Sequence, residues 1–325
     1  MAHQSNSSSQ GKRIYIQEVA TRDGFQNEAS FIETADKVAL IDSLSACGFA
    51  KVEATSFTSP RAIPALRDAE AVMHQIHRAP GVVYTVLVPN VRGAERAMSC
   101  KVDEVNLVMS VSESHNRANL RMSREQSFAQ LKDVVSAVRE SGVAINVSLS
   151  TVFGCPMEGD VDEAEVLRWM ARFAELGVHG FTLCDTTGMA YPSQVEQLCG
   201  HAANVFPQHE LTLHFHNTRG MALANVLAAI AAGIDRFDSS LGGLGGCPYA
   251  PGATGNVCTE DMVHMLQLMG YDTGIDLPAL LQAAARLPGL IGHDVPSQVL
   301  KAGRRLDLHA RPDYLDEAER SKELA

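Results

Sequence analysis

Two histidines, His214 and His216, stand two residues apart in the segment Leu211–Asn217. The alternation of Leu, Thr and Phe in this segment predicts a β-strand. Because residues i and i+2 of a strand point to the same side, His214 and His216 would face one side together. Two adjacent imidazoles can form half of a metal site. The alternative is a pair of structural histidines joined by hydrogen bonds.

Acidic, basic and amide side chains stand directly after other apolar segments. Arg22 and Asp23 follow the first such segment, Glu53 lies in the second, and Asp185 and Asn256 come later in the chain. An acid, two imidazoles and an amide oxygen could together bind one ion, and a ligand set without thiolate suits Mg²⁺, Mn²⁺ or Zn²⁺. The alternatives are that Asp23 caps a helix and that Arg22 and Glu53 form a structural ion pair.

The elements that must position these residues alternate regularly between strand and helix. The expected strands are Ile14–Ala20, Lys51–Phe57, Val82–Val88, Glu104–Val111, Ala144–Phe153, Gly180–Asp185, Leu211–His216 and Arg236–Leu241. The expected helices are Thr34–Cys47, Pro64–Arg78, Val91–Cys100, Ser123–Ser141, Asp162–Leu176, Pro192–Val205, Gly220–Ala232 and Thr259–Met269. Eight strand–helix units over about 260 residues predict a TIM (β/α)8 barrel. A doubly wound sheet is disfavoured because no Gly-rich phosphate turn opens the chain.

We expect the barrel to be one catalytic domain spanning residues 14–276. Residues 1–13 form a polar, Ser-rich tail, residues 277–306 a short C-terminal helical extension on the barrel, and residues 307–325 a charged tail. The catalytic residues should meet at one rim, since active sites of this fold lie at the C-terminal ends of the strands.

The composition restricts the partners and the compartment. The chain has 325 residues, 46% of them hydrophobic, and a net charge of −11. An acidic balance argues against a nucleic-acid partner, and no apolar run approaches the roughly 20 residues that span a membrane. The seven cysteines are scattered and odd in number, which indicates reduced thiols in a cytoplasmic protein. A homodimer is the default assembly.

Cys247 lies in a segment of glycines and prolines after the last expected strand. An inert, small apolar cysteine is the commoner case. The flanking Gly246 and Pro248 place it on a loop instead, where a thiol is more often accessible.

Three stretches resemble motifs of the 3-hydroxy-3-methylglutaryl-CoA lyases. They are Glu18–Glu28 (EVATRDGFQNE), Val52–Phe57 (VEATSF) and Gly242–Asp261 (GGLGGCPYAPGATGNVCTED). The third is the most specific, because related synthases and aldolases share the Arg-Asp and His-x-His parts but lack this loop. The resemblance covers about residues 12–300 and implies the TIM-barrel fold.

The resemblance also implies roles for individual residues. It implies a divalent cation, Mg²⁺ or Mn²⁺ with Zn²⁺ as the alternative, whose ligands are Asp23, His214, His216 and Asn256. The catalytic residues that it implies are Arg22, Asp23, Glu53, Asp185 and Cys247, with Arg22 facing the developing enolate. The substrate and coenzyme A would be bound by Arg22, Gln26, Thr187 and Gly246.

The activity that the resemblance implies is cleavage of 3-hydroxy-3-methylglutaryl-CoA to acetyl-CoA and acetoacetate, a step of leucine catabolism and ketone-body formation. Ser112–Asn119 and Ile291–Arg305 differ from the stretches expected in these lyases, and Thr21 replaces a common proline. A lyase for another 3-hydroxyacyl-CoA, of the citramalyl, methylmalyl or longer branched type, is therefore the first alternative. A Claisen condensing synthase and a non-catalytic CoA-binding barrel are less favoured.

Overall fold

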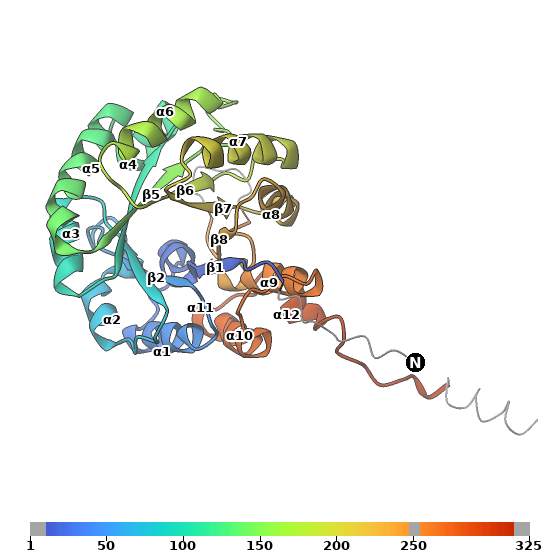
Figure 1. Cartoon of the computed structure of the whole chain (residues 1–325). Coiled ribbons are helices and arrows are strands. Elements are labelled where there is room, and N and C mark those ends of the chain that lie inside the picture. Colours follow the sequence, from blue (N-terminus) through green and yellow to red (C-terminus); the bar gives the residue numbers. More distant parts are fainter. Residues whose placement is uncertain (1–10, 247–253, 315–325) are drawn as a thin grey trace, which may run out of the picture.

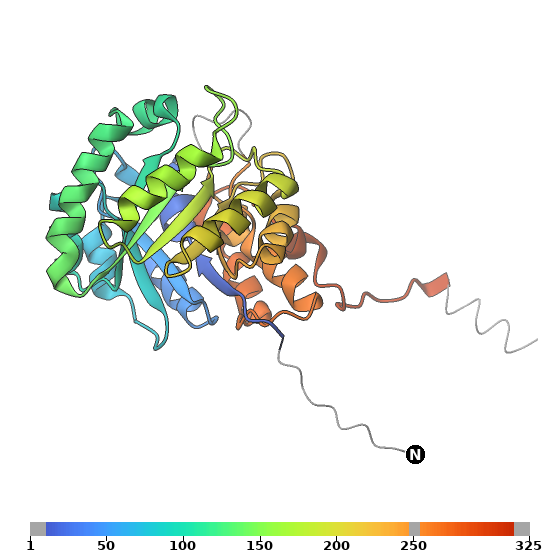
Figure 2. The same cartoon turned by 45° about the horizontal axis from the view of Figure 1, so that its top comes forward.

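The structure is a computed structural model that describes residues 11–246 and 254–314, and Cys247 lies outside these residues. Eight parallel strands pair in chain order, and β8 pairs with β1 to close a barrel with helices around it (Figures 1 and 2). The strands are β1 Tyr15–Glu18, β2 Lys51–Ser56, β3 Val83–Leu87, β4 Glu104–Ser110, β5 Ala144–Ser150, β6 Gly180–Asp185, β7 Glu210–Phe215 and β8 Arg236–Ser239. The expected TIM barrel is confirmed.

The helices follow the strands in the expected alternation. They are α1 Thr34–Ser45, α2 Ala69–Gln75, α3 Val91–Ser99, α4 Glu113–Leu120, α5 Arg124–Val138, α6 Glu163–Ala174, α7 Pro192–Val205, α8 Ala222–Ala231 and α9 Thr259–Leu268. Three further short helices follow the barrel, and they are α10 Leu277–Ala284, α11 Leu287–Ile291 and α12 Gln298–Ala302. Helices α10 and α12 both pack against α9.

Three local features differ from the sequence prediction. The first expected strand ends early, at Glu18, and a turn of π-helix, η1 (Ala20–Gly24), follows it. The helix expected from Pro64 begins only at Ala69, after a short 3₁₀ turn. Helix α4 was not expected at all. Its sequence, ESHNRANL, has no apolar periodicity, and it is started instead by the hydroxyl of Ser112, which accepts a hydrogen bond from the amide of His115.

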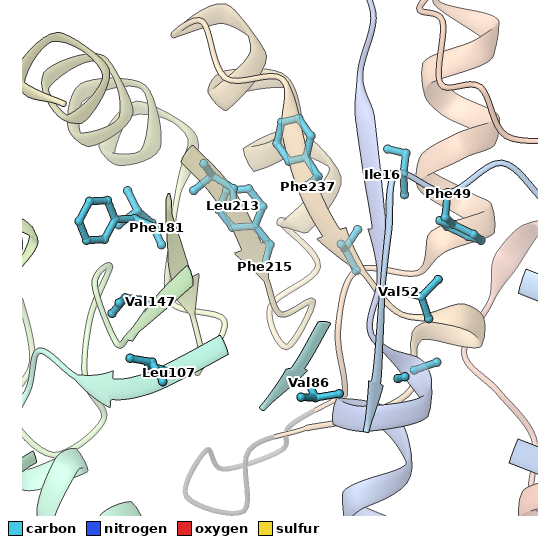
Figure 3. Close-up of a cluster of buried hydrophobic side chains, with 14 of the residues drawn as sticks. Ile16, Phe49, Val52, Val86, Leu107, Val147, Phe181, Leu213, Phe215 and Phe237 are labelled. Carbon is cyan, nitrogen blue, oxygen red and sulfur yellow. The ribbon is translucent and has the colours of Figure 1, made fainter. Parts of the chain in front are cut away.

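The apolar core lies between the strands and the surrounding helices. Side chains such as Ile16, Val52, Leu107, Val147 and Phe237 are at most 3% exposed and belong to one hydrophobic cluster (Figure 3). Because side chains alternate along a strand, the neighbouring residues point into the barrel.

The inside of this barrel is polar, whereas branched apolar residues usually fill that space. A small cavity inside it is lined by polar side chains from most of the strands, among them Gln17, Lys51, Glu104, Asn146 and Thr182. The charges in this layer are paired, as in the contact of 2.6 Å between the Lys51 ammonium and the Glu104 carboxylate. The polar layer leads directly to the rim where the candidate site lies.

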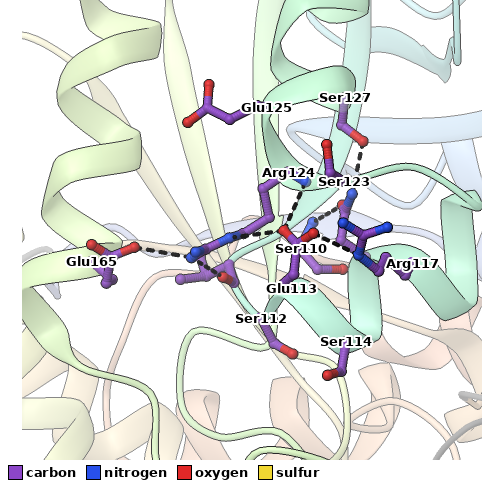
Figure 4. A network of polar contacts seen from close by, with 12 residues as sticks. Ser110, Ser112, Glu113, Ser114, Arg117, Ser123, Arg124, Glu125, Ser127 and Glu165 are labelled. Atoms are coloured by element: carbon purple, nitrogen blue, oxygen red, sulfur yellow. Dashed lines mark hydrogen bonds and ion pairs between the residues drawn. The ribbon is translucent and has the colours of Figure 1, made fainter.

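A polar network on the outside ties three helices together (Figure 4). The guanidinium of Arg124, on α5, donates to the carboxylates of Glu113 on α4 and Glu165 on α6. It also donates to the carbonyl of Val111, directly after β4. This network fixes α4 although that helix has little apolar surface.

No helix in the described ranges is both long and apolar enough to cross a membrane.

Candidate active site and metal centre

Strand β7 delivers two imidazoles to the rim of the barrel. His214 lies within β7, and His216 follows its end, where it bridges to Asn256. Their Nε2 atoms lie 3.1 Å apart. One ligand atom from each histidine and one carboxylate oxygen of Asp23 all lie within 4.8 Å of one another, and all three residues are buried. The pairing of the histidines on one face is as the strand periodicity predicts.

The π-turn η1 presents Asp23 to the histidines. Its backbone amides at Arg22 and Asp23 both donate to the carbonyl of Val19, which closes the turn at the end of β1. The Asp23 carboxylate accepts from Arg22 Nη1 at 2.5 Å and from Asn256 Nδ2 at 2.6 Å. Burial alone would raise the pKa of Asp23, but Arg22 and the two histidines outweigh burial and hold that pKa well below its usual range. Asp23 is therefore ionised.

Asp238 supports the pair of histidines from β8, at the strand position that pairs with His214. Its Oδ2 atom lies 3.1 Å from His214 Nδ1. Burial lowers the pKa of His214, but the hydrogen bond and charge of Asp238 outweigh it and raise the pKa overall. Burial and the neighbouring His214 lower the pKa of His216 to about 3, so that ring is neutral. A carboxylate on the far nitrogen of a histidine is the usual support of a metal ligand.

The donor set fits a divalent cation. Two buried ring nitrogens and a buried carboxylate face the same point, and His216 Nδ1 has no hydrogen-bond partner among the described residues. Nitrogen and oxygen donors without a thiolate suit Mg²⁺, Mn²⁺ or Zn²⁺. Asn256 lies beside this set, but its amide nitrogen donates to Asp23 Oδ2 and to the carbonyl of Leu244.

Arg22 lies beside Asp23 and forms an ion pair with Glu53, whose side chain lines the inside of the barrel. The Nε and Nη2 atoms of Arg22 each lie 2.6 Å from Glu53 Oε2. Burial would lower the pKa of Arg22, but the charges of Glu53 and Asp23 outweigh burial and raise the pKa above its usual range. Arg22 is 8% exposed and its guanidinium stays charged, so it offers a fixed cation at the rim.

Asp185 ends β6 at the same rim and is only 1% exposed. Its Oδ1 atom accepts from the amide of Met189 at 2.7 Å, whereas Oδ2 has no partner among the described residues. Burial raises the pKa of Asp185 to about 6. A carboxyl group with such a pKa can hold or accept a proton near neutral pH.

The remaining sequence-predicted residues lie around this centre. The hydroxyl of Thr187 is buried and donates to the carbonyl of Gly154 at 3.4 Å. Gln26 follows η1 and is partly buried. The carbonyl of Gly246 accepts from Asn27 Nδ2 at 2.7 Å.

Three residues at the site were not singled out from the sequence. Asp238 and Asn106 are polar residues at inward positions of strands, and strand alternation is the signal that could have identified them. Glu18 is the first residue of the motif Glu18–Glu28, but the sequence assigned no role to it. Its Oε1 atom accepts from the amides of Ala20 and Leu241, so it joins η1 to the segment after β8.

Comparison with known proteins is consistent with this geometry. Residues 13–287 match the HMGL-like family. The chain belongs to this family. The resemblance predicted from the three motifs is therefore confirmed.

The relatives of this HMGL-like protein are named as lyases, and the similarity extends over nearly their whole length. Hydroxymethylglutaryl-CoA lyase YngG of Bacillus subtilis is 45% identical over 89% of this chain and 97% of its own. A Pseudomonas aeruginosa enzyme named 3-hydroxy-3-isohexenylglutaryl-CoA/hydroxy-methylglutaryl-CoA lyase is 40% identical over 90% of this chain and 97% of its own. The structure of an HMG-CoA lyase from Acinetobacter baumannii, in complex with coenzyme A and 3-methylmalate, is 50% identical with a TM-score of 0.88, covering 92% of this chain and 98% of its own.

Proposed function

We propose that this HMGL-like protein is a divalent-metal-dependent carbon–carbon lyase that cleaves 3-hydroxy-3-methylglutaryl-CoA to acetyl-CoA and acetoacetate. The observation that carries this proposal is the meeting of the Arg22 cation with the buried group of Asp23, His214 and His216 at one rim. Family membership over residues 13–287 supports the same reaction.

The reaction has two physical demands. The tertiary hydroxyl of the substrate must lose its proton, and the C2–C3 bond then breaks to give acetoacetate and the enolate of acetyl-CoA. The enolate must in turn receive a proton on carbon. Because the hydroxyl is a very weak acid, the site must favour the loss of its proton. Because the enolate oxygen gains negative charge, the site must also stabilise that charge.

The proposed ligands of the cation are Asp23, His214 and His216, with Asn256 as a fourth. A bound divalent cation would supply Lewis acidity, which favours loss of a proton from an oxygen beside it. Asp23 contributes its fixed negative charge, and Asp238 keeps the ring of His214 in place through Nδ1. The proton of the hydroxyl passes to a carboxylate of the rim, either Asp23 or Asp185, and the pKa of about 6 favours Asp185 as the group that can release it again.

Arg22 is proposed to stabilise the enolate oxygen. Its guanidinium is held by Glu53 and Asp23 before substrate arrives, so no reorganisation is needed when charge develops. We propose that the Cys247 thiol protonates the enolate carbon, since a thiol with an ordinary pKa near 8.5 can donate at neutral pH, and that the resulting thiolate takes up the proton that the rim carboxylate received from the hydroxyl. Gln26, Thr187 and Gly246 are proposed to contact the acyl-CoA.

A cleavage assay tests this function. The protein is incubated with 3-hydroxy-3-methylglutaryl-CoA and Mg²⁺ or Mn²⁺, then with EDTA, and both acetyl-CoA and acetoacetate are measured. We expect equal amounts of the two products and loss of both with EDTA. Absence of both products from metal-loaded protein would refute this substrate assignment.

A second candidate substrate is a longer branched 3-hydroxyacyl-CoA. The Pseudomonas aeruginosa relative carries both an isohexenylglutaryl and a methylglutaryl thioester in its name. A panel of thioesters that differ only in the branch at C3 discriminates the two, and a higher kcat/KM for the longer branch would favour the second.

We also propose Mg²⁺ or Mn²⁺ as the native ion, a homodimer as the assembly and the cytoplasm as the compartment. The six cysteines in the described ranges are all free and buried, which supports a reducing compartment. Elemental analysis of purified protein and light scattering coupled to size-exclusion chromatography test the ion and the assembly.

A further inference from the structure

The polar interior of the barrel contains a chain of hydrogen bonds that ends at Arg22. Asn146 Nδ2, on β5, donates to Thr182 Oγ1 and to Asn106 Oδ1, at 2.9 and 3.1 Å. Asn106, on β4, donates from Nδ2 to Glu53 Oε1 at 3.0 Å. Glu53, on β2, then accepts from Arg22. The chain therefore crosses the barrel from β6 to the rim.

The orientation of the Asn106 amide is fixed by its neighbours. Its Oδ1 atom accepts from Asn146 Nδ2 and from Ser148 Oγ, which lies at 2.8 Å. A rotated amide would place its oxygen against the Glu53 carboxylate and its nitrogen against the Asn146 nitrogen, and both contacts would repel. The NH₂ group of Asn106 therefore faces Glu53, and the residue is only 6% exposed.

Both oxygens of Glu53 have partners. Oε2 receives Arg22, and Oε1 receives Asn106. A carboxylate held at one oxygen only can rotate about its last bond, whereas one held at both cannot. Burial raises the pKa of Glu53, and the donors on Arg22 and Asn106 act in the opposite direction, which favours the charged form that Arg22 needs.

We propose that Asn106 is a positioning residue, whose hydrogen bond to Glu53 fixes the guanidinium of Arg22 for the lyase reaction. This inference rests on the proposed function. The side chain of Asn106 bonds to Glu53, Asn146 and Ser148 and not to Asp23, His214 or His216, so its effect should fall on turnover and not on metal binding. Displacing a catalytic group by about 1 Å can cost about 10²-fold in rate.

Two variants test the proposal. Asn106→Asp keeps the shape but places a second carboxyl against Glu53, and Asn106→Ser removes the amide donor and shortens the side chain without adding charge. We expect kcat to fall about 10- to 100-fold in each, while KM and the metal content stay near those of the parent. For Asn106→Asp, the ratio of its kcat to that of the parent should rise as the pH falls, because a protonated carboxyl restores one donor. Asn106→Ser should show no such recovery.

Thr85→Val is the matched control. Thr85 lines the same cavity and is 3% exposed, but its hydroxyl has no partner among the described residues. Valine has nearly the same shape, so this change should leave kcat at the parent value. A parent-like kcat in Asn106→Asp at neutral pH would overturn the proposal. So would a loss of rate that only follows the folded fraction, since that is what a purely structural residue would give.

A crystal structure of Asn106→Asp separates this inference from the proposed function. We expect the Glu53 carboxylate to have left Arg22. If the parent protein cleaves no thioester, the proposed function fails, and the position of Glu53 still tests the role of Asn106. Unchanged contacts of 2.6 Å between Glu53 and Arg22 would refute that role.

Discussion

At the scale of single residues, the site is built from charges that are buried together. Arg22 is 8% exposed and contacts two carboxylates, and Asp23 in turn faces two imidazoles. Removing one member of such a group leaves the others buried without a partner, which is costly. Each side chain is therefore held in place by its neighbours before any substrate binds.

Arg22→Gln should lower kcat by about 10² to 10³, the usual cost of losing one preorganised donor at developing charge. The metal content should be retained, since Asp23, His214 and His216 are unchanged, and the chain should still fold but unfold at a lower temperature, because Glu53 loses its cation. The measurement is steady-state cleavage together with thermal unfolding. Arg96→Gln removes another partly buried arginine–glutamate pair, with Glu70, that includes none of the proposed site residues, and it serves as the control. A kcat near the parent value would remove Arg22 from the mechanism.

His214→Ala should weaken metal binding, because it removes one of the two ring nitrogens that face Asp23. Elemental analysis after dialysis against a known concentration of Mn²⁺ measures this directly. His201→Ala is the control, since His201 is an exposed histidine on α7 that pairs with Glu163. Equal metal content in His214→Ala and the parent would contradict the ligand assignment.

At the scale of elements, residues 241–245, which follow β8, pack against η1. The described parts of the segment between β8 and α9 pair with the ends of β7 and β8, as in the hydrogen bond from the amide of Val257 to the carbonyl of Phe215. Gly245 has a φ of +100°, and an added Cβ would lie 2.5 Å from Asn256 Nδ2 and 3.0 Å from Asp23 Oδ2. The backbone can approach the site this closely only because the residue is glycine.

Gly245→Ala should therefore displace Asn256 or Asp23 and lower both metal affinity and kcat, by about tenfold or more. Gly233→Ala is a close match for the control. Gly233 has a φ of +98° with nothing within 4 Å of the added Cβ, so it suffers the backbone strain alone. Comparing cleavage rates and metal affinities of the two variants isolates the steric effect, and equal losses in both would argue against it.

At the scale of the whole molecule, the barrel is stabilised from outside by apolar packing, whereas paired charges and hydrogen-bonded amides lie inside it, and further acids are buried between the strands and the helices. Glu18 lies on the side of β1 that faces the helices, the side of Ile16, where it is fully buried near a second buried acid, Glu260. Its carboxyl contacts the hydroxyl of Thr259 at 2.7 Å in addition to two backbone amides. Burial raises the pKa of Glu18 from 4.5 to about 8.

This pKa predicts how stability depends on pH. Between about pH 4.5 and 8 the folded protein holds a proton on Glu18 that the unfolded chain has released. The free energy of unfolding should therefore fall as the pH rises through this range, by at most about 1.4 kcal/mol per pH unit from this group. Urea unfolding of the parent and of Glu18→Gln at several pH values measures it.

The parent should lose stability more steeply with rising pH than Glu18→Gln does. Glu140→Gln, at an exposed glutamate, should keep the slope of the parent. Identical slopes in the parent and in Glu18→Gln would show that Glu18 is charged in the folded protein.

The sequence by itself determined the features that depend on short-range periodicity. Alternating apolar segments and helix signals predicted all eight strands and the barrel, because side-chain direction repeats every two residues in strands and every 3.6 in helices. The same periodicity placed His214 and His216 on one face. It also placed Arg22 and Asp23 after the first strand and Glu53 within the second, and the structure brings Arg22 into contact with both acids.

Only the tertiary structure decided what these residues contact. Asp238 reaches His214 from the neighbouring strand, and Asn106 on β4 reaches Glu53 on β2. Neither contact leaves a local pattern in the sequence. The π-turn that presents Asp23 and the polar α4 likewise depend on backbone and side-chain hydrogen bonds, which hydrophobic periodicity does not report. Closure of the barrel is the physical reason, because it brings together side chains that are far apart along the chain.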